Sequence, residues 1–332
     1  MRLNKNIKIF INYFLGPLLF IWLGWSIYNQ IKHQPDLENK WQEVRTSLKS
    51  YKIFYLVAVI ILMFVNWGIE TIKWKISIHT IQPISFFRAF KAVLSGVSFS
   101  VSTPNRVGEY LGRMLYMDEG NRLKVISATI IGSISQLIIT LLMGTLGLII
   151  LLPKIKAAEI FSALWMQVII YGVFAVLVLL TLFYFRLSWI VKWVQRLGGS
   201  KRFAFLISAL EDFNTILLLR LLSLSFLRFL VFVVQFYLLF LLFDVDISWW
   251  QSFWAVNVSF LVLAIIPTIA VAELAQRGAI VLTIMKLFSS NVLGINLATA
   301  CIWFINLIIP AIIGSLLILG LRKIVKTSPS SR

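Results

Sequence analysis

Long apolar stretches dominate this sequence and constrain its fold more than any other feature. Six of them reach the roughly 20 residues that an α-helix needs to cross about 30 Å of hydrocarbon. They lie near residues 10–30, 53–72, 125–151, 163–185, 222–243 and 296–320. Apolar residues make up 60% of the chain and charged residues 13%, whereas soluble domains average roughly 45–50% and about 25%. The sequence predicts an all-α polytopic membrane protein with six full spans, in which residues 1–332 form a single integral membrane domain.

The basic residues predict the orientation of these spans. A formal net charge of +18 would suggest nucleic-acid binding in a soluble protein, but in membrane proteins Lys and Arg gather in cytoplasmic loops. If the six spans alternate, the N terminus and three basic groups fall on one side: Lys73 and Lys75; Arg186, Lys192, Arg196, Lys201 and Arg202; Arg322, Lys323, Lys326 and Arg332. We expect a multi-pass protein of the bacterial cytoplasmic (inner) membrane with both termini in the cytoplasm, and no nucleic-acid partner.

Two further segments have the pattern of helices that lie along the membrane surface. Apolar residues recur at steps of three and four within residues 33–52 and again within 188–198, and basic residues stand between them in the second segment. Such a stripe places the apolar side chains on one face of a helix. The sequence therefore predicts two interfacial helices in addition to the spans.

Residues 84–118 and 247–288 are apolar enough to enter the bilayer, but a proline interrupts each of them. Aligned at an offset of 163, residues 84–93 and 247–256 share five identities and two Phe-to-Trp pairs, and Pro104 falls on Pro267. One inserted residue then aligns Glu109 with Glu273 and Arg113 with Arg277. This match predicts an internal duplication.

An odd number of spans separates the two copies. If each copy is a re-entrant helical hairpin, the copies enter the membrane from opposite faces and form an inverted repeat. Paired proline-broken apolar segments in two halves of a chain are typical of transporter substrate sites near the bilayer midplane. Pro104, Gly108 and Pro267 are the expected structural hinges of these hairpins.

Charged side chains in these segments are the candidate substrate-binding residues. Glu109 and Arg113 lie one helical turn apart, as do Glu273 and Arg277, so each pair can neutralise itself and serve only to lock a hairpin. The functional alternative is that the helix after each proline presents its positive end and an arginine to an anionic headgroup. Arg106, which has no counterpart in the second copy, is the first candidate for a phosphate ligand.

Polar residues in the spans supply the other candidates for the substrate pathway. Glu70 is either an interfacial residue paired with Lys73 or Lys75, or a proton carrier. We expect Arg228 to extend toward the cytoplasmic interface rather than into the lipid path. Gln136, a further pathway candidate, should bond between helices, as should Asn257 and Asn306.

Few residues favour metal or covalent chemistry. Cys301 is the one cysteine, and His33 and His79 are the two histidines, so the sequence predicts no metal site, no cofactor and no disulfide. The pair Asp244 and Asp246 could hold a metal, but two carboxylates on a short polar loop need no such explanation. No nucleophile stands at motif spacing from a base, so we expect no catalytic residue.

The stretch Thr103-Pro104-Asn105-Arg106-Val107-Gly108-Glu109 resembles the Pro-x-Arg-x-Gly-Glu motif of the flippase-like transmembrane domain that precedes the synthase domain in the multiple peptide resistance factor, the lysylphosphatidylglycerol synthase. The likeness covers essentially the whole chain, and no polar globular segment follows residue 321, so we expect a stand-alone member without the synthase domain. The resemblance implies lipid transport: movement of an anionic, aminoacylated or polyprenyl-linked lipid between leaflets.

Two alternatives remain beside a lipid flippase. One is an integral-membrane enzyme that acts on a lipid-linked substrate at the same polar site, although we expect no enzyme activity. The other is a non-transporting subunit that partners a separate synthase or glycosyltransferase. The expected partner of a flippase or of an enzyme is a membrane phospholipid or a lipid-linked substrate. The protein could also form an oligomer.

Overall fold

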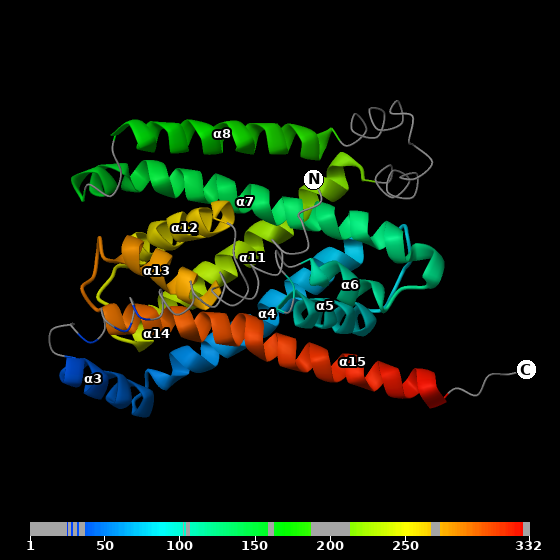
Figure 1. Cartoon of the computed structure of the whole chain (residues 1–332), viewed down its shortest axis with the longest axis horizontal. Helices are drawn as coiled ribbons and strands as arrows, with labels where there is room; N and C mark the ends of the chain where they lie inside the picture. Colours follow the sequence, from blue (N-terminus) through cyan, green and yellow to red (C-terminus); the bar gives the residue numbers. More distant parts are fainter. Residues whose placement is uncertain are drawn as a thin grey trace, which may run out of the picture. The chain divides into compact units, whose positions relative to one another are not determined.

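The structure is a computed structural model that describes residues 25, 28, 32, 37–101, 103, 107–158, 163–186, 213–266 and 273–327. Within these residues the regular structure is helical, which confirms the all-α prediction (Figure 1). The elements are α3 (Leu37–Lys49), α4 (Ile53–Ser77), α5 (Phe86–Val101), α6 (Gly108–Met114), the short 3₁₀ helix η3 (Glu119–Asn121), α7 (Arg122–Ala157), α8 (Ala163–Phe185), α11 (Thr215–Leu242), α12 (Trp249–Ile265), α13 (Glu273–Met285), α14 (Val292–Trp303), the π-helix η4 (Phe304–Ile308) and α15 (Ile309–Thr327).

Five helical segments are long and apolar enough to cross a membrane. They are Ile53–Ser77, Glu119–Ala157, Met166–Phe185, Thr215–Leu242 and Val292–Ile318, and they coincide with five of the six expected spans. The expected span near 10–30 lies outside the described residues, except for Trp25 and Tyr28, which are helical. Many large apolar side chains on these helices are exposed, as expected where lipid is the solvent.

Of the two expected interfacial helices, the structure describes one. The segment Leu37–Lys49 forms α3, in which Val44 and Ser47 are buried while Trp41 and Leu48 are exposed. The second, near 188–198, lies outside the described residues.

Each of the two expected repeat segments contains a pair of helices. Residues 84–118 contain α5 and α6, and residues 247–288 contain α12 and α13. Pro104 and Pro267, the expected hinges, lie outside the described residues. Re-entry into the membrane and the inverted relation of the two copies stay predictions.

The chain divides into two compact units. Unit 1 comprises Met1–Met63, Thr140–Leu177 and Leu230–Phe304, and unit 2 comprises Phe64–Ile139, Val178–Phe229 and Ile305–Arg332. The α5–α6 pair therefore belongs to unit 2, and the α12–α13 pair to unit 1.

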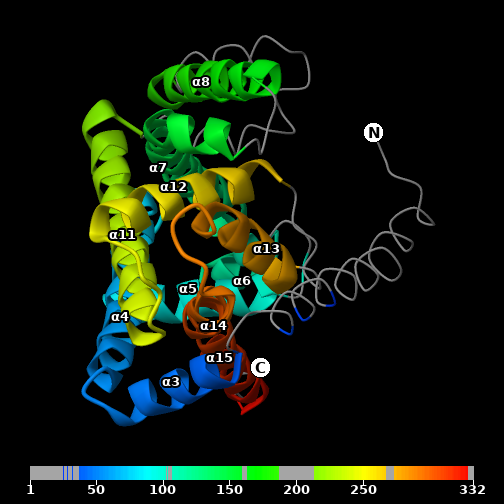
Figure 2. The same ribbon diagram turned by 90° about the vertical axis from the view of Figure 1, so that its left-hand side faces the viewer.

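In unit 2, α5 and α6 form a tightly closed antiparallel hairpin, with α15 against the other side of α5 (Figures 1 and 2). A Cβ at Gly112 would lie 2.5 Å from the backbone nitrogen of Gly96, so glycine is required for this close approach. At the tip, the Gly108 amide donates to the Thr103 hydroxyl at 2.7 Å. Gly108 has no positive φ and packs directly against the Phe99 carbonyl, which gives this expected hinge a packing role.

In unit 1, the loop between α11 and α12 is held from two sides. Asp244, the one described non-glycine residue with a positive φ (52°), accepts hydrogen bonds from Lys52 and from Ser47, the latter at 2.5 Å. The Asn291 side chain, which caps α14, donates to the carbonyl oxygens of Phe243 and Asp244 at 3.1 and 3.0 Å. In the same unit, α13 packs against both α12 and α14 (Figure 2).

Candidate functional site

Helix α4 carries a polar stripe along one face of its unit 2 portion. Asn66, Glu70, Lys73 and Ser77 follow at steps of three and four residues, which places them on one face of the helix. All four are buried, with exposures of 0%, 4%, 2% and 2%. A helix of apolar composition thus presents charged groups to the protein interior, as polar residues in membrane spans do.

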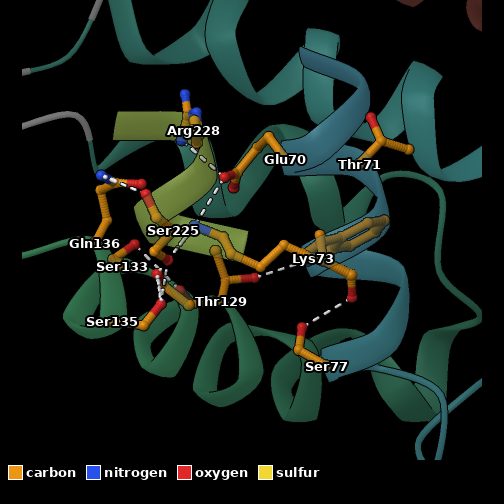
Figure 3. A network of polar contacts seen from close by, with 12 residues as sticks. Glu70, Thr71, Lys73, Ser77, Thr129, Ser133, Ser135, Gln136, Ser225 and Arg228 are labelled. Carbon is orange, nitrogen blue, oxygen red and sulfur yellow. Dashed lines mark hydrogen bonds and ion pairs between the residues drawn. The ribbon is translucent and has the colours of Figure 1, made fainter. Parts of the chain in front are cut away.

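Glu70 accepts hydrogen bonds from three cations that come from three helices. Lys73 of α4 lies 2.8 Å from its Oε2, Arg113 of α6 lies 2.8 Å from its Oε1, and Arg228 of α11 lies 2.7 Å from its Oε2. Figure 3 shows Lys73 and Arg228 converging on this carboxylate. Glu70 is therefore the centre of a group that we call the ion network: Glu70, Lys73, Glu109, Arg113 and Arg228.

The ammonium group of Lys73 is fully enclosed by acceptors. Besides Glu70 it donates to the Gly132 carbonyl at 3.2 Å and to the Ser225 hydroxyl at 3.4 Å. The Ser225 hydroxyl lies 2.8 Å from that of Ser135 (Figure 3). Helices α4, α7 and α11 are thus joined by hydrogen bonds around one buried cation, and burial of a charge requires such partners.

Arg113 joins the network to the α5–α6 hairpin. Its Nη2 donates to Glu109 one turn earlier on α6 and also to Glu70. The Arg113 side chain is 2% exposed, whereas that of Glu109 is 25% exposed. The Arg113 Nε is buried and has no hydrogen-bond partner among the described residues. Arg113 Nε is therefore a buried donor of the network that no described residue satisfies.

Arg228 turns toward the interior of unit 2. Its Nε donates to the Asn66 Oδ1 at 2.7 Å, and the Asn66 Nδ2 donates to the Asn306 Oδ1 at 3.3 Å. Its guanidinium also lies over the Trp67 ring at 5.1 Å. The expected extension of Arg228 toward the cytoplasmic interface stays a prediction, and within unit 2 its guanidinium bonds to Glu70 and Asn66 of α4.

Three of the residues that these hydrogen bonds join lie near the middle of helices long enough to cross a membrane. Asn66 is near the middle of α4, Arg228 near the middle of α11, and Asn306 near the middle of the span Val292–Ile318. Asn306 is also within the π-helix η4, a form that occurs frequently at functional sites. Groups at the midpoint of a span lie in the hydrocarbon region, where an unpaired charge costs about 2.5–3.5 kcal/mol or more.

Several of the residues predicted from the sequence meet in this network. Glu70, Glu109, Arg113 and Arg228 belong to it, and Gln136 lies beside it, donating to the Ser225 carbonyl at 3.4 Å. The bond of Gln136 and that of Asn306 join different helices, as expected. Arg106 lies outside the described residues.

The remaining described candidates lie in unit 1. Glu273 and Arg277 are a pair within α13 of unit 1, with Arg277 Nη2 2.9 Å from Glu273 Oε1. Asn257 is fully buried on α12, yet neither of its side-chain polar atoms has a partner among the described residues. The expected interhelical hydrogen bond of Asn257 is thus wrong for this part of the chain, because Gly144 and Gly147 of α7, which have no side chains to offer, pack against α12 at that position.

Sequence reasoning missed the hydroxyl groups and the role of Lys73 as a buried cation. Ser225 accepts from its ammonium and in turn contacts the Ser135 hydroxyl, and Thr129 accepts from the Trp74 indole at 3.0 Å. The helical spacing of Asn66, Glu70 and Lys73 could have predicted one polar face of α4. Among the described residues no group of three or more His, Cys, Asp or Glu side chains could hold a metal ion.

Comparison with known families gives a match over nearly the whole chain. The family model described as the lysylphosphatidylglycerol synthase TM region matches residues 13–314. The chain belongs to this family. Its membership in the lysylphosphatidylglycerol synthase TM family, together with the five long apolar helices, makes it an integral membrane protein of a family associated with lipid handling. A search of curated proteins found no match.

Proposed function

We propose that this protein moves a lipid between the two leaflets of the membrane, and that the ion network receives the lipid headgroup. The single observation that carries the proposal is the ion network itself: Glu70, Lys73 and Arg113 are buried, and the α4 and α11 helices that carry Glu70, Lys73 and Arg228 are long and apolar enough to cross a membrane. Ionisable residues inside a membrane are costly and usually mark a substrate or ion pathway. Membership in a family associated with lipid handling makes a lipid the substrate to test first.

The α5–α6 hairpin supports this assignment. Glu109, on α6, is the most exposed carboxylate of the network at 25% of its side chain, whereas Glu70 is 5% exposed. The network therefore has one side that a headgroup can approach and one that is closed by protein. A translocation site needs such access for the polar group, while acyl chains can stay among the exposed apolar side chains of the helices.

A leaflet assay in proteoliposomes tests the proposal. The full chain would be reconstituted with headgroup-labelled anionic, zwitterionic and aminoacylated lipids, and label movement compared for wild type, Arg113→Lys and Glu119→Gln. Glu119 is a matched control because it pairs with Arg122 at the surface with 90% of its side chain exposed. We expect movement by wild type and Glu119→Gln and loss in Arg113→Lys. No movement of any lipid by folded wild-type protein would contradict the proposal.

The same preparation separates the alternatives. Analysis of the lipids after incubation would detect a chemically altered product, which is the outcome that an integral-membrane enzyme predicts. Purification of an associated synthase or glycosyltransferase with an inactive wild-type protein is the outcome that a partner subunit predicts. We propose the transporter without enzyme activity, in the bacterial inner membrane with both termini in the cytoplasm, and cysteine labelling at loop positions would test this orientation.

A further inference from the structure

The guanidinium of Arg113 uses only part of its binding edge. Nε and Nη2 lie on the same edge of a guanidinium, and together they match two oxygens of a phosphate or carboxylate. In this structure Nη2 donates to both Glu70 and Glu109. The neighbouring Nε is buried and lacks a partner among the described residues. Two carboxylates therefore share one nitrogen while the adjacent donor is unsatisfied.

The two carboxylates differ in how firmly they are held. Glu70 also binds Lys73 and Arg228, and its side chain is 5% exposed. Glu109 bonds to Arg113 alone among the described residues, and its side chain is 25% exposed. Withdrawal of Glu70 would leave buried cations without a counter-ion, which is strongly unfavourable. Withdrawal of Glu109 would leave only Arg113 in need of an acceptor, and Glu109 itself can turn to a more polar environment.

We propose that Glu109 is an exchangeable counter-ion, which holds Arg113 until the phosphate of an anionic lipid headgroup replaces it on the Nε–Nη2 edge. This inference rests on the proposed function, since it names the substrate class of the same site. The lipid phosphate supplies two oxygens for the two nitrogens, whereas Glu109 satisfies only Nη2. The exchange converts one ion pair into another, so no bare charge is exposed to the hydrocarbon region during loading.

Charge also selects an anion over a cation at this position. With Glu109 withdrawn, Arg113 and Lys73 face the single carboxylate of Glu70, which Arg228 shares. A lipid whose headgroup has a net positive charge would be repelled by these cations, because charges are poorly screened in the protein interior. A lipid phosphate without a compensating ammonium restores the balance. The site therefore favours phosphatidate, phosphatidylglycerol or a polyprenyl phosphate over an aminoacylated lipid.

Binding measurements on the full chain in nanodiscs test the exchange. The probes are fluorescent phosphatidylglycerol, phosphatidylcholine and an aminoacylated phosphatidylglycerol, with inorganic phosphate as competitor. For Glu109→Gln we expect the dissociation constant for phosphatidylglycerol to fall by about tenfold, because the competing carboxylate is gone. Arg113→Lys should raise it by about tenfold or more, since an ammonium lacks the planar edge. Glu119→Gln should leave it unchanged.

Several outcomes would overturn the exchange. Weaker binding of phosphatidylglycerol by folded Glu109→Gln would show that Glu109 supports the ligand. A preference of wild type for the aminoacylated lipid would reject the substrate class, and displacement by inorganic phosphate at equal concentration would reject a lipid headgroup. Glu109→Asp is a second variant that keeps the charge. Its shorter side chain holds Arg113 less well, so binding intermediate between wild type and Glu109→Gln is expected, and binding weaker than that of wild type would contradict the exchange.

The failure of this inference differs from the failure of the proposed function. Tighter binding by Glu109→Gln without lipid movement by wild type would support the exchange and contradict the transporter. Lipid movement by wild type with weaker binding by Glu109→Gln would support the transporter and contradict the exchange.

Discussion

Arg113 Nη2 lies 2.8 Å from Glu70 Oε1, although 43 positions separate the two residues in the chain. This bond ties α6, half of a proline-interrupted segment, to the buried face of the spanning helix α4. Within the hairpin itself, Arg113 also pairs with Glu109, as the four-residue spacing predicts. Arg113 therefore makes one ion pair within the hairpin, with Glu109, and one to the spanning helix α4, with Glu70. The pair with Glu70 joins the hairpin to the ion network.

Replacement of Glu70 by glutamine should destabilise the protein most among the network variants. Glutamine keeps the size of the side chain but removes the carboxylate that Lys73, Arg113 and Arg228 share. Breaking a buried pair by removing one partner costs about 3–5 kcal/mol. Thermal unfolding of the protein in detergent would measure a lower Tm. Glu119→Gln, at an exposed position, is the control, and an equal Tm for the two variants would contradict this interpretation.

Lys73→Met should cost less than Glu70→Gln. It removes one buried cation and leaves Glu70 bound to Arg113 and Arg228. The Ser225 hydroxyl keeps its contact with Ser135 at 2.8 Å, and the Gly132 carbonyl still accepts from Ser135 at 2.7 Å. The main loss is therefore the ion pair with Glu70 at 2.8 Å, and it leaves no buried charge unpaired because Glu70 keeps two cations. The order of the two Tm values is the measurement. A larger loss for Lys73→Met would place the centre of the network at Lys73.

Gly314→Ala should destabilise the packing of α15 on α5. A Cβ at Gly314 would overlap the carbonyl oxygen of Leu94, which belongs to the backbone of α5 and cannot rotate away. Overpacking of this kind costs about 1–3 kcal/mol. Gly68→Ala is the matched variant within α4, since nothing lies within 4 Å of its added Cβ. It should gain about 0.5–1 kcal/mol from helix propensity, so opposite shifts in Tm are expected, and shifts of equal sign would refute the packing argument.

Asp244→Asn tests the loop that joins α11 and α12. Asparagine tolerates the positive φ of this position, so the variant removes the charged pair with Lys52 and one of the two carboxylate oxygens that accept from Lys52 and Ser47. The two side chains are 24% and 31% exposed, and a partly exposed pair contributes about 1 kcal/mol or less. We expect a small decrease in Tm that shrinks at high salt. Asp246→Asn, at an exposed neighbour, should change nothing. A decrease that is independent of salt would attribute the effect to hydrogen bonds alone.

Asn257→Leu should leave stability unchanged or increase it. The amide is fully buried and its polar atoms lack partners among the described residues, so an apolar side chain of similar size removes a desolvation cost. Asn66→Leu is the contrast, because Asn66 bonds to Arg228 and Asn306, and it should lower the Tm. A large loss of stability in Asn257→Leu would indicate a partner for this amide outside the described residues.

Local sequence determined the spans and the charge pairs within helices. Five expected spans, the helix predicted within residues 33–52 and the pairing of Glu109 with Arg113 follow from properties that act over a few residues. Hydropathy decides whether a segment enters the bilayer, and helical spacing decides which side chains of one helix meet. The same reasoning offered Lys73 or Lys75 as a partner for Glu70, and the structure pairs it with Lys73, one turn away.

Only the tertiary structure decided which helix supplies each remaining partner. Glu70 binds Arg113 of α6 and Arg228 of α11, and Arg228 also bonds to Asn66 of α4. Hydropathy cannot predict this, because the rotation of a helix about its axis depends on how all its neighbours pack. Asn257 depends on packing in the same way. Its position faces glycines of α7, so its amide meets no hydrogen-bond partner among the described residues.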